Sequence, residues 1–269
     1  MRLTRGQPRG GSVVNLSRVG RIDLRDLHAI SVYYGREFIP YPFVVRDPER
    51  CNIYARRADG ADPAPDRFNH GDLRVFRQWF TTYLSADIWV ECNVQYFSTD
   101  PPSQRILAHR SGGYGFLAIQ TADHEVDVFT LPPQDLGSAI AGSAVLTKPG
   151  KRTKIVIPEY IPRPSRSTAA DGAPAAFSVP VTASATTPKV PESEITLYAT
   201  AQSHWRPTRE WGFDRTKDAA VWVRVKDDGD YLYVPDYSHA KPMTARDLRD
   251  SVNRLISKDI SALKRFQED

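Results

Sequence analysis

Cysteine and long apolar runs are scarce in this sequence, and each scarcity excludes a class of protein. The two cysteines, Cys51 and Cys92, lack the spacing of a metal site and suggest no disulfide framework, which is typical of a reducing cytoplasm. No apolar segment approaches the roughly 20 residues of a membrane-spanning helix, and none near the N-terminus is long enough for a signal peptide. We therefore expect a cytoplasmic protein without membrane insertion.

The residue patterns of common catalytic and metal sites are also lacking. The six histidines are too scattered for two imidazoles to share a metal at i, i+4 spacing, and no G-x-S-x-G elbow occurs. The glycines at 112, 113 and 115 lead into an apolar strand pattern, and no lysine follows at the P-loop position. We expect no metal, no cofactor and no catalytic residue, which favours a binding protein by elimination. An enzyme whose groups meet only in the fold stays an alternative.

Charge and composition are ordinary for a globular protein. Hydrophobic residues make up 41% of the chain and charged residues 25%, which is enough for one large core or two fused halves. The net charge of +4 is partly carried by residues 1–20, a Gly-rich segment that we expect to be a disordered basic tail. A basic cluster at residues 148–154 leaves a nucleic-acid-associated actinobacterial or phage protein as a second alternative, although it lacks the aromatics of a stacking platform.

One local pattern occurs twice in the chain. Residues 114–131 read as a β-hairpin that a proline pair ends, and a helix follows from Gln134 with Leu136, Ile140 and Val145 on one side. Residues 219–234 read as a second hairpin that ends at a proline, and a helix follows with Thr244 as its N-cap. Neither copy could bury its sheet face alone. We therefore predict a duplication in which both hairpins superpose by a twofold rotation within one sheet.

Other elements follow from hydrophobic periodicity. The pattern predicts helices from Ile22 to Tyr34 and from Asp72 to Leu84, and strands over 37–45 (at an edge), 88–97, 105–109, 153–157, 194–202 and 211–216. Residues 158–191 are rich in Pro, Ala, Ser and Thr and predict a flexible linker. The expected organisation is an N-terminal half over 21–157 and a C-terminal half over 192–269 of the same sheet.

An ordered set of degenerate motifs covers most of the chain and resembles the EspG family, the cytoplasmic chaperones of type VII (ESX) secretion in actinobacteria. The motifs are Ile22-Asp23-Leu24, Ile39-Pro40-Tyr41-Pro42-Phe43-Val44-Val45, Gln78-Trp79-Phe80-Thr81-Thr82, Ile88-Trp89-Val90-Glu91-Cys92-Asn93-Val94, Tyr96-Phe97-Ser98, the 115–131 hairpin, Leu136, Ile155-Val156-Ile157-Pro158, Trp211-Gly212-Phe213-Asp214-Arg215-Thr216 and Gly229-Asp230-Tyr231-Leu232-Tyr233-Val234-Pro235.

The resemblance implies an α+β fold with a central, mostly antiparallel sheet, helical bundles packed on it and pseudo-twofold symmetry. It also implies a function, which is to keep the helical tip of a PE–PPE-like (or WxG-type) substrate soluble and to deliver it to the secretion machine. The expected partner is therefore a heterodimeric helical substrate, with nucleic acid not expected and a homodimer left open. The chain departs from the family at 158–191, where the family has helices of its second bundle, and this puts the identity of the substrate in doubt.

The partner-binding surface is expected at the turn after the strand that ends at Phe97, because the equivalent turn contacts substrate in the family. Aromatic residues of the second hairpin would supply further anchors if they are exposed on the sheet. The predicted set is Phe97, Ser98, Thr99, Asp100, Pro101, Pro102, Gln104, Trp222, Tyr231 and Tyr233. The alternative for Tyr231 and Tyr233 is that they lie under a helix as core residues.

Overall fold

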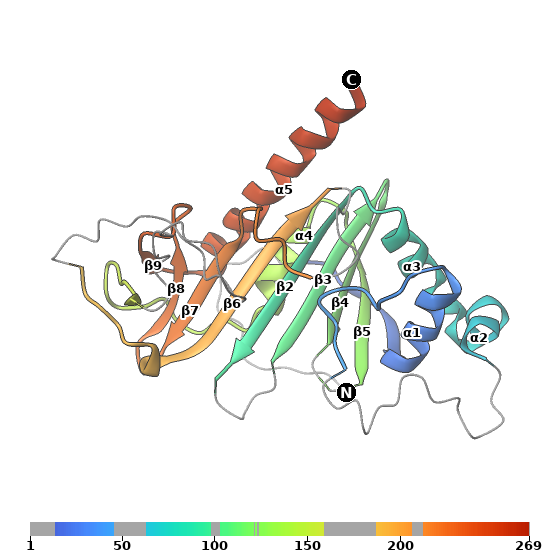
Figure 1. Cartoon of the computed structure of the whole chain (residues 1–269), viewed down its shortest axis with the longest axis horizontal. Helices are drawn as coiled ribbons and strands as arrows, with labels where there is room; N and C mark the ends of the chain where they lie inside the picture. The colour runs from blue at the N-terminus through green and yellow to red at the C-terminus, as the bar shows by residue number, and fades with distance from the viewer. Residues whose placement is uncertain are drawn as a thin grey trace, which may run out of the picture.

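A computed structural model describes residues 14–45, 63–97, 103–120, 122, 124–158, 187–205 and 212–268. These residues form one nine-stranded sheet in the order β1-β5-β4-β3-β2-β6-β7-β8-β9, in which every neighbouring pair is antiparallel (Figure 1). The strands are β1 Ser17–Asp23, β2 Ile88–Tyr96, β3 Gln104–Ser111, β4 Tyr114–Gln120, β5 Glu125–Leu131, β6 Ile195–His204, β7 Ala220–Val225, β8 Gly229–Tyr233 and β9 Ala240–Pro242. The helices are α1 Leu24–Tyr33, α2 Ala64–His70, η1 Asp72–Phe76, α3 Arg77–Leu84, α4 Leu136–Ser143, η3 Glu192–Glu194 and α5 Ala245–Glu268. The α+β prediction, with both halves in one antiparallel sheet, is confirmed.

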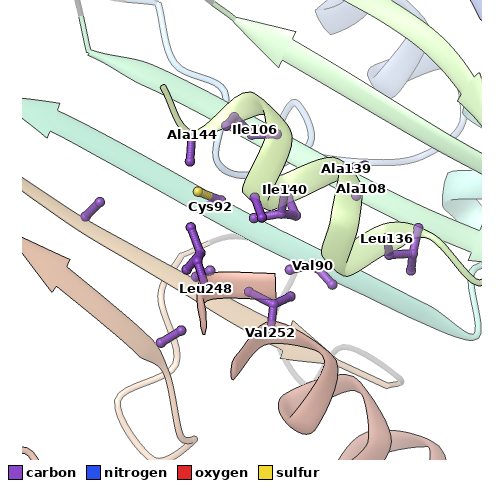
Figure 2. Close-up of a cluster of buried hydrophobic side chains, with 14 of the residues drawn as sticks. Val90, Cys92, Ile106, Ala108, Leu136, Ala139, Ile140, Ala144, Leu248 and Val252 are labelled. Atoms are coloured by element: carbon purple, nitrogen blue, oxygen red, sulfur yellow. The ribbon is translucent and has the colours of Figure 1, made fainter. Parts of the chain in front are cut away.

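One face of the sheet packs against α4 and α5. Alternate residues of β2 point to this face, as the strand period of two requires. Figure 2 shows Val90 and Cys92 of β2 beneath Ile140 of α4 and Val252 of α5, all of them buried. Cys92 is therefore a small core residue, as predicted, and Cys51 lies outside the described residues.

The opposite face of the first half packs against α1, α2, η1 and α3. Its core is aromatic, with Phe68, Trp79 and Phe80 fully buried beside Trp89 of β2. The ring centroids of Phe68 and Phe80 lie 6.0 Å apart at 84°, an edge-to-face contact that aromatic pairs favour. The aromatic stripe predicted for residues 72–84 is thus core, although its first turn is a 3-10 helix.

Residues 145–158, which we call the strap, leave the end of α4, where Leu146 packs against the core beneath α4 and α5. The later part of the strap and Val190 cover the opposite face of the second half. Ile155 and Ile157 of the strap pack with Val190, Val223 and Tyr231 in a separate buried cluster. The strap also covers the outer edge of β9, because Ile155 and Ala240 exchange two backbone hydrogen bonds of 2.9 Å each. Isolated bridges at Ile155 and Val156 replace the strand predicted over 153–157.

The start of the described chain differs from the sequence prediction. Residues 17–20, expected in the disordered tail, form part of β1 together with Ile22 and Asp23, which were expected to open the first helix. The strand forms by pairing with β5, more than a hundred residues away in the chain, and the Arg21 guanidinium binds Asp127 of that strand at 2.8 Å. The helix begins at Leu24, with the Asp23 carboxylate accepting from the N–H of Arg25.

The predicted match between the two hairpins is wrong by one strand. Counted outward from the central β2–β6 pair, β4 and β5 are third and fourth on their side, whereas β7 and β8 are second and third on theirs. Strand order instead aligns the β4–β5 hairpin with β8–β9, and each of these is followed by a helix, α4 or α5. The short strand β9 was missed because only three residues, one of them proline, form it. The duplication itself stays a prediction.

Three further segments need correction. Residues 37–45 form turns rather than a strand, and the side chain of Gln120 binds the backbone N–H and carbonyl of Val44 at 3.0 and 2.7 Å. The described part of 211–216 is a turn region, with Trp211 itself outside the described residues. The predicted linker ends before residue 191, because Lys189 bridges to Val156 and Val190 is fully buried, while 159–186 lies outside the described residues.

Candidate functional site

Half of the predicted binding surface can be located in the structure. Ser98, Thr99, Asp100, Pro101 and Pro102 lie outside the described residues. Phe97 directly follows β2 and is 47% exposed, and its N–H donates to the carbonyl of Thr196 at 3.1 Å. Gln104 opens β3 opposite Val94 and is half-buried. Phe97 is thus an exposed aromatic residue at the position where the sequence predicted one.

The predicted aromatics of the second hairpin are not exposed. Trp222 and Tyr231 are fully buried and Tyr233 is 7% exposed, so the prediction that they are exposed sheet anchors is wrong and the core alternative holds for both tyrosines. Trp222 packs beneath α4 and α5, whereas the two tyrosines lie beneath the strap and not under a helix, as that alternative had it. The Tyr231 hydroxyl donates to Asp228 at 2.7 Å and accepts from the N–H of Arg152 at 2.9 Å, which fixes the strap to the hairpin.

Phe97 lies at one end of the sheet, where β2 and β7 finish and β6 and β8 begin; we call this end the sheet rim. The strand register puts Tyr96, Leu197, Arg224 and Asp230 side by side across β2, β6, β7 and β8. Tyr96 is half-buried, and burial raises the pKa of its hydroxyl, so the phenol is uncharged at neutral pH. The rim therefore carries Tyr96 and Phe97 at the end of β2 and an ion pair two strands away.

At the β7–β8 part of the rim, the Asp230 side chain accepts several hydrogen bonds. Its carboxylate is fully buried and accepts from Arg224 Nε at 2.7 Å, from the Thr147 N–H at 2.5 Å and from the Thr147 hydroxyl at 3.0 Å. Arg224 also donates through Nη2 to the carbonyl of Val145 at 2.7 Å. A buried charge requires such compensation, and these bonds fix the first residues of the strap onto the rim.

Val145 is the rim residue that the sequence reasoning assigned wrongly. It was expected on the buried side of the helix, but α4 ends at Ser143 and the Val145 side chain is 54% exposed. Its φ of 36° lies in the left-handed region, where glycine is the usual residue after a helix. The sequence signal that could have placed it is the run Thr147-Lys148-Pro149-Gly150, whose polar and turn-forming residues end the helix earlier.

A second polar group, on the face opposite α4 and α5, is the one place where the described residues suggest chemistry. Glu91 and His204 lie on neighbouring strands with Oε2 and Nε2 3.2 Å apart, and Trp89 Nε1 donates to Glu91 Oε1 at 3.2 Å. Burial raises the pKa of Glu91, and the contact with His204 opposes this effect. The nearby Cys92 and Ser203 point to the opposite face, and burial raises the pKa of the Cys92 thiol, so neither is a nucleophile for this pair.

The described residues contain no group of three or more His, Cys, Asp or Glu side chains placed to hold a metal ion. None of their helices combines the length and the apolar composition that a membrane crossing requires.

These features define an α+β protein built on one antiparallel sheet, with exposed apolar side chains at the sheet rim as a candidate protein-binding surface. No family model and no curated protein matches the chain. Among solved structures, it is similar to the Mycobacterium tuberculosis type VII secretion system chaperone EspG5, solved in complex with the PE25–PPE41 dimer. The TM-score is 0.45 and the identity 8%, over 88% of this chain and 95% of that chain. A likeness of this degree assigns neither a family nor a function.

Proposed function

We propose that this chain is a cytoplasmic chaperone of type VII secretion. In this role it binds the helical tip of a PE–PPE-like (or WxG-type) substrate, keeps the substrate soluble and delivers it to the secretion machine. The observation that carries the proposal is the ordered motif set of the EspG family in the sequence. Its central segments coincide with regular elements of the sheet: Ile88–Val94 lies in β2, the 115–131 hairpin is β4–β5, and the motif that begins at Gly229 includes β8.

The sheet rim supplies a physical basis for binding such a partner. An amphipathic helical tip buries its apolar residues on a few anchors, and aromatic residues usually dominate those anchors. Phe97, at 47% exposure, has the position and chemistry for one anchor, and the half-buried Tyr96 precedes it at the end of β2. With Trp222, Tyr231 and Tyr233 in the core, the proposed surface reduces to Phe97, Gln104 and the turn that joins them.

The proposal is tested by affinity purification of the tagged chain from its native host, with mass spectrometry of the proteins that co-elute. We expect a pair of helical proteins with the wild-type chain and a loss of both with Phe97→Ser. Tyr114→Ser is the matched control, because Tyr114 is 56% exposed and begins β4 at the opposite end of the sheet. Retention of the pair by Phe97→Ser would show that the rim does not bind the partner. Recovery of no helical protein would contradict the chaperone function.

One observation favours the nucleic-acid alternative. The Ile155–Ala240 bridge puts Lys154 beside Lys241, and neither lysine has a carboxylate within ion-pair distance among the described residues. Burial, Lys241 and Lys154 together lower the pKa of the neighbouring His239. If this cluster binds phosphates, duplex binding should weaken steeply with salt, and Lys154→Gln with Lys241→Gln should reduce the salt slope by about two charges. Salt-independent or absent binding rejects this alternative.

A further inference from the structure

We draw no further inference here: the strongest candidate, the Glu91–His204 pair across β2 and β6 on the sheet face opposite α4 and α5, carries nothing, because no contact among the described residues shows a substrate, ligand or partner on which this pair would act.

Discussion

The ring of Tyr231 occupies the space in which a side chain on Gly150 would begin. A Cβ built on Gly150 would overlap the ring carbon Cζ and the hydroxyl of Tyr231. The close approach lets the strap pass over the β7–β8 hairpin, where the Tyr231 hydroxyl binds Asp228 and the N–H of Arg152. Glycine at position 150 and the burial of Tyr231 therefore depend on each other, and this explains why Tyr231 is core and not a binding anchor.

Gly150→Ala should destabilise the protein by about 1–3 kcal/mol, because the added methyl group forces the strap away from the hairpin. Denaturant unfolding measures the change. Gly142→Ala is the matched control, since a Cβ at this position near the end of α4 meets nothing within 4 Å and alanine is the better helix former. It should stabilise by about 0.5–1 kcal/mol. Equal effects of the two substitutions would refute the packing argument.

Acid should destabilise the fold through His109. Its imidazole is fully buried, Nε2 lies 3.1 Å from the carbonyl of Trp79, and burial lowers its pKa from 6.5 to about 3. A lowered pKa means that the unfolded chain binds the proton more readily. The stability from neutral His109 is therefore present above pH 6.5 and is lost as the pH falls from 6.5 toward 3. Between pH 7 and pH 5 this single group should cost about 2 kcal/mol.

Urea unfolding at these two pH values checks the effect. His109→Gln keeps a donor for the Trp79 carbonyl and removes the titration, so its loss of stability on acidification should be smaller than that of wild type by about 2 kcal/mol. His70→Gln, at an exposed position of α2, controls for removal of a histidine as such. A wild-type and a His109→Gln protein with the same pH dependence would show that His109 does not titrate in this way.

The composition of the Pro- and Ala-rich segment predicts that replacing residues 160–186 with a short Gly/Ser linker leaves the thermal midpoint nearly unchanged. The structure sets the boundary of this prediction. A replacement extended to Val190 removes a fully buried side chain and the hydrogen bond from the Val190 N–H to the Val156 carbonyl at 2.9 Å, so it should lower the midpoint by several degrees. A large drop with the shorter replacement would show that 160–186 packs on the fold.

Hydrophobic periodicity predicted the strands and helices whose buried residues recur at a fixed spacing in the sequence. The alternation from Ile88 to Tyr96 gave β2 and both of its faces, and the Thr244 cap gave the start of α5, where the Thr244 hydroxyl donates to Asp247 at 2.6 Å. Strand β1 was missed because its stability comes from pairing with β5, including the Arg21–Asp127 contact, which local sequence does not reveal.

The site was predicted only in part for a similar reason. Period-two alternation shows that Tyr231 and Tyr233 share a face, but it does not show that a strap from residues 145–158 covers that face. Val145 fits a helical periodicity, and only its backbone angle shows that the helix has already ended. Phe97 was predicted as the last residue of the strand, whereas it lies just beyond the end of β2 and is exposed, and its binding role stays a prediction.

The central claim is that the chain keeps a helical partner soluble through the sheet rim. The most direct measurement is the soluble fraction of the co-purifying helical pair when it is expressed alone, with the wild-type chain, with Phe97→Ser and with Tyr114→Ser. The account predicts an aggregated pair alone, a soluble complex with wild type and with Tyr114→Ser, and aggregation again with the folded Phe97→Ser chain. A pair that is equally soluble alone, or equally soluble with Phe97→Ser and with wild type, would contradict the claim.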